Sequence, residues 1–545
     1  MAVQSWLDHF SENTREVYAV LGILIIGSAT YIRDLGSFSL IGWDESLYAL
    51  VVRSIVENGH WIAPRLQFLH RGPIVTEPFM EKPPFVFWVQ AVSVTVLGDS
   101  EFALRLPSAL ATIATAIVIY WFLRRYSVGA GLFGAVSFLT MPYVFAGFNA
   151  GRTGSTDALF VFFGTLALCT LWVATADDRR DIFYVGAGAT VLMLLSKGFA
   201  AGVFAIIALP VLAVRWKWLW KNRVPAATAT VVATVAVLAW PTVMYMRYGD
   251  PFINIIFINH VVERAASYST FPFVQAFPAF TDPWLFVVPA AVVARFRSQM
   301  ERLLVFSVWW VVAVLAFFSL TAGGPWYIAP AFPGLAVAVG IILDDAVSRT
   351  PRRAVAVLIC LGLGLLISPR LPIQLVPVVT NGLRSPPSGL RYLLGIGVFS
   401  VVVGFGLVRQ LDLWPENIDW TKSQLIGLVL AGLLLSAPVA ISGSWAVNEG
   451  NLGKSAHEHT SPDATVYLAD GVIQNHPPNW YGFSYYSERS ISRVPLSDVK
   501  SGMVIVVPES RLNELQCEYT VLDQQPIAGA EFALLEIDCS TRQPS

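Results

Sequence analysis

The chain has 545 residues, of which 55% are hydrophobic and 13% are charged, against about 25% charged in a typical soluble domain. A soluble protein of this composition would expose large apolar surfaces, so the composition indicates a membrane protein whose lipid-facing side chains are apolar. The formal net charge of −1 and the lack of a basic block speak against a partner nucleic acid.

Apolar runs along the chain predict an all-α polytopic membrane domain over residues 1–444. A spanning helix requires about 20 apolar residues. The first run, Val17–Ile32, follows acidic residues and precedes no A-x-A cleavage site, so we expect a transmembrane helix there instead of a signal peptide. The runs predict about thirteen spans, at 17–34, 102–123, 128–148, 157–176, 182–196, 199–214, 224–246, 283–295, 303–321, 326–343, 354–369, 390–408 and 424–443.

Basic residues between these spans predict the sidedness of the protein, because Lys and Arg favour the cytoplasm. All of the clusters can be cytoplasmic at once if the N-terminus is cytoplasmic and the C-terminus is outside: Arg124-Arg125, Arg179-Arg180, 215–223, 295–297 and Arg352-Arg353. The apolar run Phe85–Gly98 would reverse this order if it crossed. We therefore expect it to lie along the membrane or re-enter it, in a multi-pass protein of the plasma (inner) membrane.

Three extramembrane regions matter for function, and one of them is an outside loop over about residues 249–282. Residues 36–101 form an outside loop too long for a simple connector, so we expect it to be ordered or functional. Residues 445–545 alternate strand-like runs with turns and predict a small soluble extracytoplasmic α/β domain. Cys517 and Cys539 in this domain can form a disulfide if the domain is outside, whereas Cys169 and Cys360 lie in apolar runs and are expected to be core thiols.

Acidic and basic residues in the first outside loop suggest chemistry at the membrane surface. Asp44 and Glu45 lie in GWDESLYA, where a carboxylate can accept a proton from a nucleophile or bind a metal ion. Glu81 and Lys82 precede two prolines that fix the backbone, and a lysine can hold a phosphate as a point charge. The alternatives are ordinary acidic residues of an exterior loop and an ordinary charged helix start.

Further polar residues lie on the same predicted side. Asp157 opens a span in GRTGSTDALF, where a helix N-cap is the alternative reading. Arg152 and Lys197 are basic on the outside, against the usual bias, which favours a functional role. His260 and Arg264 are four residues apart, hence on one face of a helix. A neutral imidazole can bind a metal, although a solvated histidine is the simpler alternative.

Several segments together resemble a known family, and they extend over about residues 17 to 343. They are GWDESLYA, NGHWIAPRL, EKPPFVFW, LGDSEFALRLPSAL, RTGSTDALF, LLSKG, NHVVERA followed by Pro283-Trp284, and GGPWYIAPAFPGLA. Their order is similar to that of the GT-C glycosyltransferases, in the branch of the dolichyl-phosphate-mannose protein mannosyltransferases and the lipid A aminoarabinose transferase. The resemblance implies a helical bundle whose long first outside loop contains juxtamembrane helices.

The resemblance also implies the reaction. A sugar would move from a polyprenyl-phosphate carrier to a glycan, lipid or protein acceptor on the outer face, with membrane lipids as surroundings. Such a transfer passes through a cation-like transition state while the leaving phosphate gains negative charge, so cations should gather near the phosphate. We expect inversion by a single displacement. No G-x-G-x-x-G sequence opens a βαβ unit, and none is needed when the donor is a lipid.

Roles for the polar residues follow from the resemblance alone. It implies a catalytic group that contains Asp44 as base or acceptor-orienting carboxylate, with Glu45 and Asp157. It implies that Lys82 holds the donor phosphate and that phosphate or lipid head groups contact Arg152, Lys197, Arg264 and Tyr327. Glu81 and His260 are the candidate ligands of a divalent metal ion (Zn, Mg or Mn). The branch usually spaces His and Arg more closely than His260 and Arg264.

Three other functions remain open. A lipid or sugar transporter would place ionisable residues near the middle of the bilayer, whereas these spans are almost free of charge. A membrane anchor for the C-terminal domain would not need so many spans. An O-antigen ligase or glycan polymerase also works outside, but would not account for the DE and EKPP arrangement.

Overall fold

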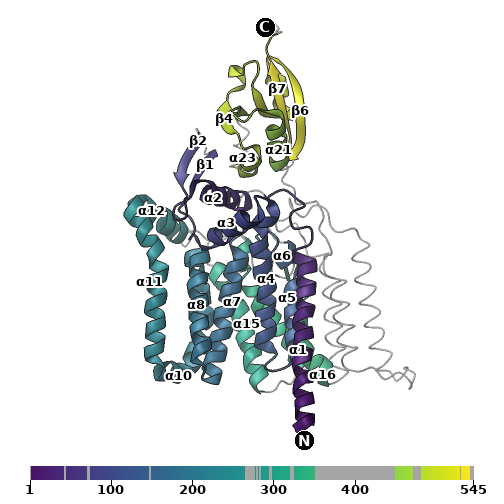
Figure 1. Ribbon diagram of the computed structural model, residues 1–545, viewed down its shortest axis with the longest axis vertical. Coiled ribbons are helices and arrows are strands. Elements are labelled where there is room, and N and C mark those ends of the chain that lie inside the picture. Colours follow the sequence, from purple (N-terminus) through teal and green to yellow (C-terminus); the bar gives the residue numbers. More distant parts are fainter. Residues whose placement is uncertain are drawn as a thin grey trace, which may run out of the picture.

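A computed structural model describes residues 2–41, 44–69, 74–146, 149–263, 277, 280–281, 284–293, 298–319, 325–349, 449–470, 480–527 and 530–540. In these residues a bundle of helices carries a mixed α/β segment at one end (Figure 1). Arg264, Cys360 and the predicted spans 354–369, 390–408 and 424–443 lie outside the described residues.

The bundle consists of apolar helices at the predicted spans. Five described stretches are long and apolar enough to cross a membrane, so the helical membrane architecture is confirmed, while the count of thirteen spans stays a prediction. The helices are α1 (Ala2–Tyr31), α4 (Glu101–Leu123), α5 (Val128–Thr140), α6 (Pro142–Ala146), α7 (Asp157–Asp177), α8 (Arg180–Lys197), η1 (Gly198–Ala201), α9 (Gly202–Val214), α10 (Trp216–Lys221), α11 (Arg223–Tyr248), α12 (Asp250–Ile253), η2 (Asn254–Glu263), η3 (Trp284–Val293), α15 (Ser298–Ser319), η4 (Pro325–Ile328) and α16 (Ala331–Arg349).

The first long loop is ordered and lies across the upper end of the bundle in Figure 1. It contains α2 (Asp44–Asn58), an antiparallel hairpin of β1 (Arg65–Leu69) and β2 (Ile74–Pro78), and α3 (Phe85–Leu97). The 13 residues of α3 extend about 20 Å at 1.5 Å each, less than the roughly 30 Å of a hydrocarbon core. This length agrees with the prediction that the run does not cross the membrane.

The C-terminal segment contains a five-stranded sheet in the order β4-β3-β5-β7-β6. The strands β3, β4 and β5 are parallel, and β5, β7 and β6 pair antiparallel. Its apolar core includes Val466, Trp480 and Leu534. The elements are α21 (Glu449–His459), β3 (Thr465–Ala469), α23 (Tyr481–Ser487), β4 (Ser490–Val494), η7 (Leu496–Asp498), β5 (Val504–Pro508), η8 (Glu509–Glu514), β6 (Glu518–Ile527) and β7 (Ala530–Asp538).

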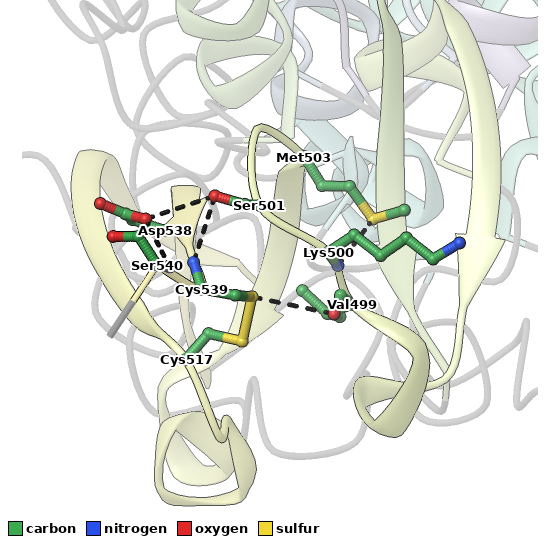
Figure 2. The surroundings of a disulfide bond; sticks show 8 residues. All are labelled: Val499, Lys500, Ser501, Met503, Cys517, Asp538, Cys539 and Ser540. Carbon is green, nitrogen blue, oxygen red and sulfur yellow. Dashed lines mark hydrogen bonds between the residues drawn. A yellow bond between two sulfur atoms is a disulfide. The ribbon is translucent and has the colours of Figure 1, made fainter. Parts of the chain in front are cut away.

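A disulfide joins Cys517 to Cys539, as the sequence allows (Figure 2). The register of β6 and β7 places Glu518 opposite Asp538, so the two cysteines directly flank a strand pair. Their Cα atoms are 4.6 Å apart, within the range of ordinary disulfides. Cys169 is a buried free thiol, in agreement with the sequence.

We expect the disulfide to stabilise the C-terminal segment. It closes a loop with a sequence separation of 22, and a crosslink over such a loop stabilises by about 3 kcal/mol through the chain entropy of the unfolded state. In the full-length C517S/C539S variant, protease should therefore cleave between residues 449 and 540 at a lower temperature than in wild type. Reductant should sensitise wild type and leave the double variant unchanged; equal sensitivity of both proteins without reductant would contradict the prediction.

A set of polar contacts fastens the C-terminal segment onto the first long loop. The guanidinium of Arg53 donates to the Tyr485 carbonyl oxygen at 2.7 Å and lies 3.9 Å from the centre of the Tyr485 ring. The Tyr485 hydroxyl donates to Asp99 at 2.6 Å, and that of Tyr486 donates to Glu101 at 2.8 Å. Helix α23 is thereby held directly above α2 (Figure 1).

Candidate active site

The adjacent acids Asp44 and Glu45 begin α2 and face different surroundings, because successive helical residues are separated by about 100°. Asp44 is partly exposed, and one of its carboxylate oxygens accepts a hydrogen bond from the Asn149 side-chain amide at 2.9 Å. Glu45 points inward and is 1% exposed. Of the pair, Asp44 is the acid that a substrate can reach.

Glu45 is the centre of a buried scaffold. Its two carboxylate oxygens accept four hydrogen bonds, from Arg105 Nε at 2.7 Å and Nη2 at 2.9 Å and from the backbone amides of Ile41 and Gly154 at 2.6 Å each. Arg105 is fully buried and also donates to backbone carbonyls just after α1. The sequence predicts a catalytic role for Glu45, but a carboxylate occupied by four donors is better suited to joining α1, α2, α4 and the loop before α7.

Asp157 and Lys197 form a buried ion pair between the start of α7 and the end of α8. The side chains are 3% and 5% exposed, and Lys197 Nζ lies 4.9 Å from the centre of the Tyr327 ring. The N-cap of α7 is Thr156, so Asp157 is not the N-cap residue, which was the alternative to a functional role. Three of the predicted site residues, from three separate segments, therefore meet at one place.

The EKPP segment lies against this ion pair. Gly198 adopts a positive φ of 58° that ends α8, and a Cβ built on it would lie 3.6 Å from the Pro83 ring. Lys82 and Asp44 are both near enough to Asp157 to interact with it electrostatically. The structure thus brings Asp44, Lys82, Asp157, Lys197 and Tyr327 together, as the sequence predicts of a site on one side of the membrane.

Tyr48 lies near the acidic residues Asp44, Asp157 and Glu81, and the sequence interpretation missed it. It is 2% exposed, and its pKa is well above the ordinary value because of burial first and then the charges of Asp44, Asp157 and Glu81. Its hydroxyl therefore stays protonated. Helical spacing gives a signal for this residue, since positions 44 and 48 share a face of α2.

Tyr481 belongs to the C-terminal segment and lies beside Tyr48. It begins α23 and packs in one apolar cluster with Tyr48 and Phe79. Burial first, and then the charges of Glu81 and Asp44, raise its pKa. More than 400 residues separate Tyr481 from α2, and no local pattern in the sequence relates the two.

The sequence predicts that Arg152 contacts the substrate. In the structure its guanidinium binds backbone carbonyl groups instead. Its guanidinium donates to the carbonyl oxygens of Thr30 at 2.9 Å, Arg33 at 3.0 Å and Asp34 at 3.3 Å. A cation near the last carbonyls of a helix satisfies acceptors that lack an intrahelical partner. Arg152 thereby holds the end of α1, and only 9% of it is exposed.

The described side chains do not show whether the two predicted metal ligands, Glu81 and His260, lie together. Glu81 is exposed, and His260 belongs to η2, where only its backbone is described. Within the described ranges, no three His, Cys, Asp or Glu side chains gather in a way that could hold a metal ion. A divalent metal ion at Glu81 and His260 therefore stays a prediction.

The chain is similar to known proteins over most of its length. The family model "Dolichyl-phosphate-mannose-protein mannosyltransferase" matches residues 81–240. The undecaprenyl phosphate-alpha-4-amino-4-deoxy-L-arabinose arabinosyl transferase of Pseudomonas paraeruginosa is 26% identical over 532 residues, which cover 90% of each chain. Transferase 2 of that name from Pseudomonas fluorescens Pf0-1 is 26% identical over 444 residues, 79% of this chain and 76% of the relative.

Solved structures show the same fold. The crystal structure of ArnT from Cupriavidus metallidurans bound to undecaprenyl phosphate superposes with a TM-score of 0.69 at 20% identity, covering 98% of this chain and 99% of that one. Its apo form gives a TM-score of 0.70, with 98% and 100% covered. The likeness extends through the bundle and the C-terminal segment.

The comparisons confirm the predicted resemblance to the GT-C glycosyltransferases that use a lipid-phosphate-linked sugar, and the chain shares the fold of a solved relative of that kind. Within that class, the chain is similar to the undecaprenyl phosphate aminoarabinose transferases over most of its length. The comparisons offer nothing that favours a transporter.

Proposed function

We propose that the chain transfers a sugar from undecaprenyl phosphate or a similar polyprenyl phosphate to an acceptor, at the end of the bundle that carries α2. The observation that carries the proposal is that a reachable carboxylate, Asp44, and the cations Lys82 and Lys197 all lie near enough to Asp157 to interact with its charge. Substitution at a phosphorylated sugar needs both a base for the nucleophile and positive charge for the leaving group.

The reaction can be written as one displacement. A hydroxyl or amine of the acceptor attacks the anomeric carbon, and Asp44 takes its proton as the new bond forms. The bond from that carbon to the phosphate oxygen breaks on the opposite face, and the polyprenyl phosphate leaves with the electron pair. Lys82 and Lys197 offset the charge that develops on it, and the configuration is inverted. If a divalent metal ion binds, Glu81 and His260 would hold it, and it would supply further positive charge for the leaving phosphate.

The relatives suggest the chemistry of the donor. Their names specify an undecaprenyl phosphate carrier and a 4-amino-4-deoxy-L-arabinose unit. We infer an undecaprenyl-phosphate-linked pentose or aminopentose for this chain, and an acceptor that is a glycan, a lipid or a protein. Because Tyr481 of the C-terminal segment reaches the acidic cluster, that segment is placed to contact the acceptor.

We infer a topology to match. The protein would lie in the plasma (inner) membrane with its N-terminus in the cytoplasm and about thirteen spans within residues 1–444. Residues 445–545 would form an extracytoplasmic domain, where a disulfide such as Cys517–Cys539 persists. The cluster RWKWLWKNR around α10, at the opposite end of the bundle from α2 in Figure 1, is then cytoplasmic.

The proposal is tested by following radiolabelled undecaprenyl-phosphate sugars in membranes that contain the protein and crude acceptors. We expect wild type to move label from the carrier to an acceptor and D44N to lose at least about 100-fold in rate, because the amide cannot accept the proton. The exposed Asp463, in the C-terminal segment, provides a matched control, and D463N should transfer at the wild-type rate.

Two results would sink parts of the proposal. If wild type consumes no carrier-linked sugar although wild type, D44N and D463N are equally abundant in the membranes, the chain does not transfer sugars from these donors. If wild type is active and D44N equals it, another group is the base. The labelled product identifies the acceptor class in the expected case.

A further inference from the structure

A small cavity lies beside the acidic cluster, by which we mean Asp44, Glu81 and Asp157, and Asp157 forms part of its lining. Its volume is about 30 Å3, and its lining is mostly apolar, with five polar side chains: Thr112, Thr115, Tyr143, Asn149 and Asp157. A space of about 10–15 Å3 measured in this way holds one water molecule if two or more polar groups face it. The cavity therefore has room for one or two water molecules and the groups to bind them.

Two polar atoms at the cavity are buried without a partner. Asn149 is 2% exposed; its Nδ2 donates to Asp44, while its Oδ1 accepts no hydrogen bond. The Tyr143 side chain is 4% exposed, and its hydroxyl faces the backbone amide of Asn149 without completing a hydrogen bond. Buried polar atoms of folded proteins are nearly always satisfied by protein or by ordered water.

We propose that ordered water fills this cavity, bonds Asn149 Oδ1 and the Tyr143 hydroxyl, and thereby makes Asn149 the positioning residue for Asp44. Water can donate one hydrogen to the amide oxygen and accept one from the phenol, and its second hydrogen can reach Asp157. An amide satisfied on both sides cannot turn over, so its N–H remains directed at the Asp44 carboxylate. The inference rests on the proposed function, in which Asp44 is the base.

The role of Asn149 has an electrostatic consequence. A donor to a carboxylate favours its charged form, which is the form that accepts a proton. The groups around Asp44 and Asp157 are the acid Glu81, the cations Lys82 and Lys197, and the tyrosines Tyr48, Tyr143 and Tyr481. Removing the Asn149 donor should leave the Asp44 carboxylate free to turn away from the acceptor, and Asp44 should then be a poorer base.

Substitutions at Asn149 test the positioning role. N149D keeps the shape and replaces the donor by a second carboxylate, whereas N149A removes the group. We expect kcat at neutral pH to fall by roughly 10-fold in N149A, as for one hydrogen bond, and by roughly 100-fold in N149D. The KM for the donor lipid should stay within about 3-fold of the wild-type value in both variants.

A matched asparagine provides the control. The Oδ1 of Asn451 in α21 accepts a hydrogen bond from Ser39, so N451D preserves an acceptor and should leave kcat unchanged. If the wild-type enzyme is active and N149D keeps its kcat, Asn149 does not position Asp44. A wild type without activity would overturn the proposed function and would leave the water site to be decided as follows.

Two measurements test the water directly. Y143F removes one water partner and keeps the ring, so its effect should overlap with that of N149A: the double variant should be no slower than N149A alone. Fully independent, multiplicative losses would contradict a shared water. A structure of the wild-type protein that resolves ordered solvent should show water within hydrogen-bond distance of Asn149 Oδ1, and an empty cavity would overturn the inference whatever the activity.

Discussion

Replacing Arg105 by methionine should destabilise the whole upper end of the bundle. Methionine approximates the length of the side chain but leaves the Glu45 carboxylate buried without its cation. Breaking a buried ion pair from one side costs about 3–5 kcal/mol, which is a large part of the stability of a domain. We expect little monodisperse R105M protein in detergent, and the material recovered should unfold at a much lower temperature than wild type.

Two further variants separate the charge from the loss of packing. E45Q/R105M removes both charges and should recover part of the thermal stability, because neutral partners need no compensating ion. Arg33 pairs with Asp34 in an exposed position, where an ion pair contributes at most about 1 kcal/mol, so R33M should resemble wild type. If R105M unfolds at the same temperature as R33M and wild type, the buried ion pair of Arg105 with Glu45 does not stabilise the scaffold.

Much of the fold could be predicted because the length and polarity of apolar runs determine helices in a membrane. Every described predicted span has a helix, and the shortness of the run at Phe85–Leu97 agrees with its place outside the bundle. The pairing of Cys517 with Cys539 depends on the register of β6 and β7, which no spacing reveals. Sequence reasoning could therefore allow this disulfide but could not require it.

The candidate site was predictable in part, because its residues lie in short motifs that follow one another on one predicted side. Glu45 and Arg152 show the limit of this reasoning. Both stand in the right motifs, yet their partners lie far away in the sequence: Arg105 is 60 residues from Glu45, and the carbonyls at the end of α1 are about 120 residues from Arg152. A charged residue at the right place satisfies the scaffold or the substrate, and only the three-dimensional partners distinguish these cases.

Asn149 and Tyr481 were missed for a different reason. Asn149 stands just before the motif RTGSTDALF but outside it, and Tyr481 belongs to a region that adds little to the family resemblance. Each acquires a role only from what lies opposite it: Asp44 for Asn149, and the cluster around Tyr48 for Tyr481. Neutral residues that position charged ones leave little trace in a sequence.

Replacing Lys197 by methionine should slow transfer by about 100- to 1,000-fold even when the protein remains folded. The cation is buried beside Asp157, where low polarity strengthens its attraction for the leaving phosphate. Loss of one such preorganised group typically costs about 100- to 1,000-fold in kcat. K197M also leaves the Asp157 carboxylate buried without its cation. The single variant therefore cannot separate a catalytic effect from a structural one.

The double variant D157N/K197M resolves this ambiguity, because it removes both buried charges. We expect its melting temperature to recover toward wild type while its transfer of labelled sugar stays at the level of K197M. The exposed pair of Lys221 with Asp178, next to α10, is the matched control, and K221M should keep both stability and rate. Recovery of activity together with stability in D157N/K197M would mean that Lys197 serves only to neutralise Asp157, and that Lys82 alone supplies the charge for the leaving phosphate.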